Sequence, residues 1–164
     1  KTWGNRFICK TPMDTYKWSA SADLGLGLSR SFGNIFTSLL LTNGEGYKGV
    51  ASEDNNEKIS FQAVYGQKRL DKKDGFNLGV VFSMLPYELE DGLVDDEGKY
   101  TTDPTSKTSQ VFGFFGGFSG YGARIGFDFN QGSNLGIDGH GESSLLNSIY
   151  LNYDLSFLKG SIFT

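Results

Sequence analysis

The 164-residue chain offers few side chains for catalysis or metal binding. It contains one His, His140, and one Cys, Cys9, which excludes a His-rich metal centre, a zinc site with paired Cys and an internal disulfide. The segment 138–143 places hydroxyl and carboxylate groups beside His140, as nucleophilic catalysis would need. That segment is a glycine-rich loop in which polar residues are ordinary, and closeness in sequence defines no catalytic geometry. We therefore expect no enzyme activity and no cofactor.

Two further segments partly match known binding motifs. Residues 44–49 fit the G-x-G-x-x-G spacing of a dinucleotide-binding loop. However, the following segment 50–57 has no apolar helical face, and Glu45 would repel a pyrophosphate. The acidic side chains of residues 91–97 could bind a hard cation such as calcium, but they lack the spacing of a calcium loop. Both segments are interpreted as loops, and no metal site is predicted.

The composition indicates an all-β chain that is rich in turns. Glycine accounts for 23 of the 164 residues, about twice its ordinary share, and aromatic residues make up 15%. The net charge of −4 argues against a nucleic-acid partner, because a phosphate backbone needs a basic face. No run approaches the roughly 18 apolar residues of a membrane helix. The chain starts at Lys1 without a basic and apolar leader, so either a signal peptide has been removed or Lys1 is not the natural start.

Apolar and polar residues alternate with a period of two over long stretches. In the clearest run every even position from Tyr16 to Leu28 is apolar, and every odd position from Lys17 to Ser29 is polar or small. This run is longer than the usual strand of about 5–6 residues and fits a tilted membrane-spanning strand of roughly 9–11. Further strands are predicted at residues 35–43, 58–67, 75–85, 108–118, 121–130 and 145–157, with another beginning near residue 161 and one more within residues 1–10.

The predicted connections alternate between short and long without exception. Outer-membrane barrels have short turns on the periplasmic side and longer loops on the outer side, which accounts for such a pattern. The sequence therefore predicts a single domain over residues 1–164, an antiparallel meander of about eight strands from a transmembrane outer-membrane β-barrel. The short connections are residues 30–34, 68–74, 119–120 and 158–160, and the long ones are residues 44–57, 86–107 and 131–144.

The two faces of these strands predict two environments. If the apolar face contacts lipid, the polar face points into the lumen, with Arg30 and Lys68 near the rim formed by the short turns. The charges on the polar face are either structural ion pairs that fill the lumen or the lining of a water-filled pore. The pore-lining candidates are Lys17, Asp23, Arg30, Lys58, Lys68, Arg124, Asp128 and Asp154. The lipid-facing candidates are Trp18, Leu24, Leu26, Phe61, Phe76, Phe127 and Leu151.

Three segments, Trp3–Phe7, Ser21–Leu28 and Thr42–Tyr47, resemble an interior stretch of Gram-negative outer-membrane porins of the phosphate-selective porin type. In that family an alternating A-D-L-G-like run precedes a short turn, a strand and an N-G-E-G-Y loop start, and a strand similar to Ile59–Tyr65 follows. The resemblance covers about residues 1–85. It implies a fragment of a barrel of about 16–18 strands, commonly a trimer. No residues match the arginine ladder and lysine ring of that family, so phosphate selectivity is not implied.

The sequence thus predicts a porin in the outer membrane of a Gram-negative-type bacterium, for passive diffusion of small hydrophilic solutes or ions. Its expected partners are outer-membrane lipid, lipopolysaccharide and further copies of itself. Two alternatives stay open. One is a complete small eight-stranded outer-membrane barrel with an adhesion or structural role. Side chains would fill the interior of such a barrel. The other is a soluble β-barrel that surrounds an apolar ligand with Trp18, Leu24, Phe61 and Phe127.

Overall fold

A computed structural model describes residues 11–16, 18, 24–44, 57–89, 105–135, 143–155 and 160–163. Within these ranges a four-residue helix, α1 (Pro12–Thr15), precedes a sheet of eight strands. The strands are β1 (Gly25–Phe32), β2 (Ile35–Thr42), β3 (Lys58–Gly66), β4 (Gly75–Leu89), β5 (Thr105–Gly120), β6 (Ala123–Ser133), β7 (Ser143–Leu155) and β8 (Gly160–Phe163).

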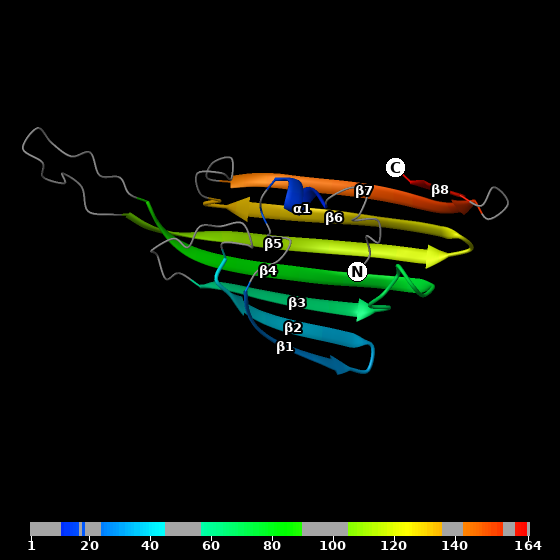
Figure 1. Cartoon of the computed structure of the whole chain (residues 1–164), viewed down its shortest axis with the longest axis horizontal. Coiled ribbons are helices and arrows are strands. Elements are labelled where there is room, and N and C mark those ends of the chain that lie inside the picture. The colour runs from blue at the N-terminus through cyan, green and yellow to red at the C-terminus, as the bar shows by residue number, and fades with distance from the viewer. Residues whose placement is uncertain are drawn as a thin grey trace, which may run out of the picture.

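Each strand pairs antiparallel with its neighbours in the chain, in the order β1 to β8 (Figure 1). This topology confirms the all-β class and the antiparallel meander. In the part of the chain that the structure describes, β1 pairs only with β2 and β8 only with β7, so the sheet is open and does not close into a barrel. No helix among the described residues has the length and hydrophobicity to cross a bilayer.

Tight turns join strands at one end of the sheet (Figure 1). Phe32 pairs with Ile35 across a two-residue turn in which Gly33 has φ of +56°. The turn between β5 and β6 has φ of +54° at Tyr121 and +76° at Gly122. Two consecutive positive φ values define the type I′ turn, whose twist matches that of the flanking strands. These turns fix the register of both hairpins.

The strand predicted from Tyr16 onward is wrong at Tyr16 and Trp18, which lie outside any strand, whereas residues 17 and 19–23 lie outside the described residues. Residues Pro12–Thr15 form α1, and the Tyr16 N–H donates a hydrogen bond to the Pro12 carbonyl at 2.9 Å. β1 begins only at Gly25, which pairs with Thr42, the last residue of β2. The start of β1 thus lies opposite the end of β2, and alternation within one segment does not report such pairing.

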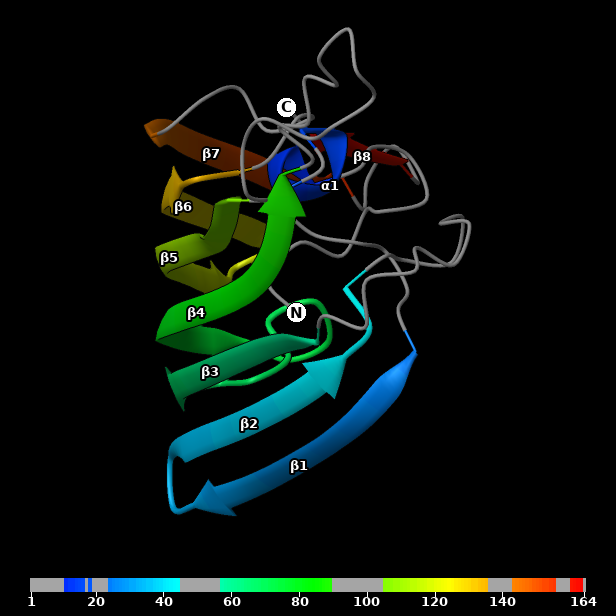
Figure 2. The same ribbon diagram turned by 90° about the vertical axis from the view of Figure 1, so that its left-hand side faces the viewer.

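The sheet bends strongly, and α1 lies on its concave side (Figure 2). Two glycines on the concave face have aromatic side chains lying across them. A Cβ added to Gly79 would overlap the ring of Phe115, and one added to Gly126 would overlap the ring of Tyr150. Each aromatic residue is the direct cross-strand partner of its glycine. Glycines thus let rings cover the backbone of the neighbouring strand, and they favour curvature of the sheet.

Candidate functional site

The outer, convex face of the sheet is mainly apolar from β1 to β7, with Arg30, Gln131 and Asn147 among its polar residues. Because side chains alternate between faces, residues that pair across strands share a face. Large apolar residues exposed on this face include Leu28, at 77%, and Phe61. One continuous cross-strand row on it consists of Leu28, Leu39, Phe61, Phe82 and Phe112.

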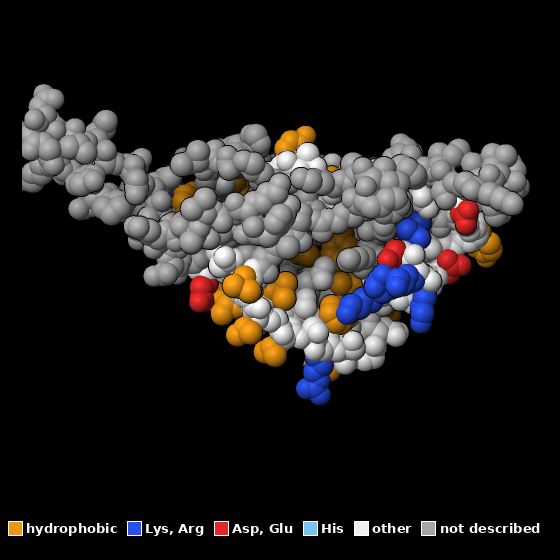
Figure 3. Space-filling view, viewed as in Figure 1, with side chains coloured by type: hydrophobic (Ala, Val, Ile, Leu, Met, Phe, Trp, Pro, Cys, Tyr) orange, Lys and Arg blue, Asp and Glu red, His pale blue; other side chains and the backbone are white. Residues whose placement is uncertain are grey.

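Aromatic side chains gather at the short-turn end of this outer face. The rings of Tyr65 and Phe76 lie 6.0 Å apart, and Tyr121 in the β5–β6 turn is 96% exposed. Figure 3 shows Lys and Arg side chains gathered toward the same end of the sheet. The exposed aromatic residues at this end are Phe32, Tyr65, Phe76, Phe118, Tyr121 and Tyr153.

Most residues predicted for the apolar face lie on it. Leu24, immediately before β1, is also exposed. Trp18 is the exception: it lies outside the sheet and is only 6% exposed, with its backbone N–H bonded to the Met13 carbonyl at 2.9 Å. Its predicted place on an exposed strand face is wrong, because the strand does not reach it. The residues placed as expected on the outer face are Leu26, Phe61, Phe76, Phe127 and Leu151.

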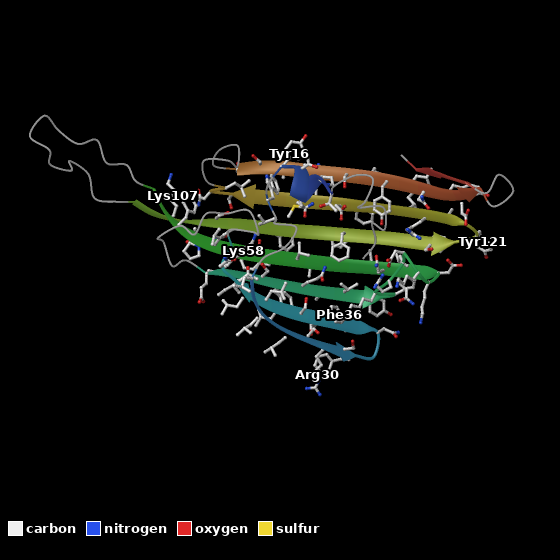
Figure 4. The ribbon with its side chains drawn as sticks, in the orientation of Figure 1. Tyr16, Arg30, Phe36, Lys58, Lys107 and Tyr121 are labelled. Atoms are coloured by element: carbon white, nitrogen blue, oxygen red, sulfur yellow. The ribbon has the colours of Figure 1, made fainter. Side chains whose placement is uncertain are left out.

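The residues predicted for the polar face divide between the two faces. Arg30 pairs with Thr37 on the outer face, and its guanidinium lies 4.8 Å from the Phe32 ring centroid. Figure 4 shows Arg30 projecting beyond the β1 edge. Side chains alternate between the two faces without interruption along β1 as far as Phe32, so Arg30 lies on the same face as Leu26 and Leu28. The residues on the concave side are Lys58, Arg124, Asp128 and Asp154, whereas Lys17 and Asp23 lie outside the described residues.

A cavity of about 320 Å³ lies between α1 and the concave face. Of the predicted pore-lining residues, Lys68 and Asp128 both line it. The Lys68 Nζ lies 3.4 Å from the ring centroid of Phe36, which is on β2, whereas Asp128 is on β6. Asp128 Oδ2 accepts a hydrogen bond of 3.0 Å from Ser148 Oγ. Five lining residues belong to one cross-strand row of the concave face, in which Gly79 stands between Val64 and Phe115; they are Phe36, Val64, Phe115, Asp128 and Ser148.

The connection between β3 and β4, residues 67–74, closes one end of the concave side. Its one apolar residue, Leu70, has no exposed surface. Arg69 donates from Nε and Nη2 to the two carboxylate oxygens of Asp71, at 2.7 and 2.6 Å. These hydrogen bonds hold the pKa of the Asp71 carboxyl below its ordinary value, against a smaller opposing effect of burial. The buried Leu70 and the ion pair give this basic turn a fixed conformation.

Sequence reasoning missed the aromatic part of the cavity. The alternating pattern assigned no role to Phe36 or Phe115, and the segment 108–118 alternates less cleanly because it is rich in Gly and Phe. Cross-strand pairing of Gly79 with Phe115 is the signal that explains this composition, but it requires the register. The segment 138–143 and the acidic residues 91–97 lie largely or wholly outside the described residues.

Comparisons with known proteins identify no family. Neither a scan against protein-family models nor searches of curated proteins and of solved structures found a match for this chain. Among the described residues, no group of three or more His, Cys, Asp or Glu side chains could hold a metal ion. Function is therefore argued from the two faces of the sheet and from the cavity.

Proposed function

We propose that the chain forms part of the wall of an outer-membrane porin, through which small hydrophilic solutes or ions diffuse passively. The observation that carries this proposal is the exposed apolar face that continues from β1 to β7. Soluble monomers rarely expose contiguous apolar patches larger than a few hundred Å², and a soluble sheet covers such a face with a second layer. A bilayer would cover it instead, leaving the concave face toward the lumen.

The height of the apolar face supports the proposal. On β4 the outer-face residues from Phe76 to Met84 are all apolar and span eight residue steps. At about 3.4 Å per residue and a tilt of about 40°, these steps cover roughly 21 Å along the membrane normal. Outer-membrane barrels have an apolar band of about 25 Å. The 15 residues of β4 and 16 of β5 also exceed the roughly 9–11 that a tilted spanning strand needs.

The aromatic end of the outer face supports the same orientation. Transmembrane barrels have aromatic girdles where the wall crosses the membrane interfaces, and their short turns face the periplasm. In this chain, exposed aromatic residues and tight turns occur at the same end of the sheet. We therefore assign that end to the periplasmic side.

The open edges of the sheet support a wall larger than eight strands. Unpaired backbone N–H and C=O groups are too costly in hydrocarbon, so a membrane sheet must close on itself. β1 and β8 are the two edges of the described sheet. We propose that further strands continue the wall beyond them, in a barrel of about 16–18 strands that assembles as a trimer.

Site-specific quenching tests the proposed orientation. Phe61 and Gln62 are adjacent on β3 and lie on opposite faces. In a background with Cys9→Ser, the variants Phe61→Cys and Gln62→Cys are each labelled with an environment-sensitive dye, and the labelled chain is inserted into lipid vesicles within a closed barrel that includes the further strands proposed above. Brominated lipid is expected to quench the label at position 61, and aqueous iodide the label at position 62. Equal quenching at both positions would overturn the proposal, and a chain that stays soluble without detergent would favour the soluble β-barrel.

A further inference from the structure

We propose that the cavity between α1 and the concave face binds a small organic ammonium ion, with the Asp128 carboxylate as its counter-charge. This inference goes beyond solute diffusion. It concerns the concave side alone and does not require that the outer face contact lipid.

Asp128 is a half-buried carboxylate without a cationic partner among the described residues. Its single hydrogen bond comes from Ser148 Oγ. Lys68 lies over the ring of Phe36, and Phe36 is on β2, four strands from the strand of Asp128 in the sheet order. Arg124 is on the same strand but four residues away, about 14 Å at ~3.4 Å per residue. A carboxylate withdrawn from water is normally paired with a positive charge, so this position favours a cationic ligand.

The aromatic surface of the cavity also favours a cation. An ammonium ion is attracted to the face of an aromatic ring. The cavity already contains one such contact, because the Lys68 Nζ lies 3.4 Å from the Phe36 ring centroid. Phe115 is the direct cross-strand partner of Asp128 and also lines the cavity. Its ring lies across Gly79 of β4 and gives the cavity that contains Asp128 a second aromatic side chain.

The remaining lining limits the size and charge of the ligand. Met13, Val64 and Val81 provide apolar contacts for an alkyl or aryl body. The volume of about 320 Å³ is at the lower end of the ~300–1,000 Å³ usual for ligand pockets. Lys68 disfavours a second positive charge in the same cavity. The geometry therefore fits a compact monocation with an apolar body, and it discriminates against an anion of the same shape near Asp128.

The test compares three ligands of similar shape and different charge on the full chain in detergent micelles. The probes are 2-phenylethylammonium, 2-phenylethanol and 3-phenylpropanoate, and the affinity is measured by titration calorimetry. We expect the ammonium ion to bind at least about tenfold more tightly than the alcohol, and the carboxylate to bind most weakly. Equal affinity for the ammonium ion and the alcohol would overturn the proposal, whatever the quenching experiment reports about lipid.

Two variants locate the charge that discriminates. Asp128→Asn should remove the preference for the ammonium ion over the alcohol. Asp154→Asn is the matched control, because Asp154 shares the concave side but does not line the cavity; it should retain the preference. Retention in Asp128→Asn, or an equal loss in the control, would contradict the assignment.

Two further variants keep the test valid if Asp128→Asn fails to fold. Lys68→Met removes the competing charge and should tighten binding of the ammonium ion several-fold. Phe115→Leu keeps the carboxylate but removes the ring, and it should weaken binding of the ammonium ion more than that of the alcohol. Unchanged affinity in both variants would overturn the site, provided that circular dichroism shows native strand content.

Discussion

The outer and concave faces are built from the same strands but differ in how their side chains are packed. Phe114 and Phe115 are neighbours in β5. Phe114 is exposed on the outer face and contacts Phe127, with ring centroids 5.6 Å apart. Phe115 lies on the concave face, across Gly79. Rings cover glycines on both faces, since Phe127 lies over Gly116 on the outer face, but only the concave face combines such packing with buried polar side chains such as Asn77 and Asn130.

A charge placed on the outer face should have the largest effect on this comparison. Phe61→Arg puts a guanidinium near the middle of β3, where a lipid-facing Arg costs roughly 2–4 kcal/mol of unfolding free energy. Gln62→Arg places the same charge on the concave face, where we expect a smaller loss. Denaturant unfolding of both variants in lipid vesicles measures the difference.

The two arginine variants distinguish a cost of placing charge in lipid from a cost of fitting a large side chain into the sheet. If the outer face contacts lipid, the loss at position 61 should shrink when the measurement is repeated in a lipid with shorter chains, because the bilayer is thinner. If Gln62→Arg is as destabilising as Phe61→Arg in both lipids, the two faces do not differ in environment and the assignment of the outer face to lipid is wrong.

The tight fit of the concave face should have the next largest effect. Gly126→Ala adds a Cβ that overlaps the ring of Tyr150, which is buried. We expect a loss of about 1–3 kcal/mol in unfolding free energy, as for overpacking of a core. Gly27→Ala is the matched control, because its Cβ meets the end of the flexible Leu40 side chain. A loss in Gly126→Ala no larger than in the control would contradict the tight packing.

The strands were predictable from the sequence where a long strand also has a long partner. The segments 58–67 and 75–85 became β3 and β4, because alternation and cross-strand pairing agree there. At Tyr16 and Trp18 alternation alone was misleading, because neither residue lies in a strand. β1 begins at Gly25, opposite Thr42 at the end of β2, and the Asn43 N–H still donates a hydrogen bond to the Leu24 carbonyl at 3.0 Å. Strand ends depend on pairing between distant segments, which a local period of two does not contain.

The candidate site was predictable only in part, for the same reason. Asp128 was found because it is a charged residue on the polar face of the alternating segment 121–130. Phe36 and Phe115 line the cavity because of the register of β2 to β6 and the position of α1. Both depend on contacts between residues that are distant in the sequence. Leu70 did carry a local signal, since it is the one apolar residue in a polar turn, but polar turns are ordinarily exposed.

Arg30 provides a smaller test of the same comparison. It is a cation on the apolar outer face, two residues before the end of β1, near the assigned periplasmic boundary. An arginine near the interface costs only about 0–1 kcal/mol. Arg30→Leu is therefore expected to change the unfolding free energy by less than about 1 kcal/mol, in contrast to Phe61→Arg. A gain of several kcal/mol would place Arg30 deep in the bilayer and contradict the assigned boundary.

The smallest expected effect is a pH dependence in the turn 67–74. Arg69 lowers the pKa of the Asp71 carboxyl in the folded chain, whereas the unfolded value is about 3.9. Because the folded pKa is the lower one, the pair contributes its full stability above pH 3.9, and the contribution is lost as the pH falls through the folded pKa. Denaturation midpoints of the wild type and Arg69→Met should therefore differ at pH 7 and converge at low pH. Lys72→Met removes the same charge from the same turn but leaves the ion pair, so its difference from the wild type should lack this convergence; parallel curves for Arg69→Met would show that the pair does not stabilise the turn.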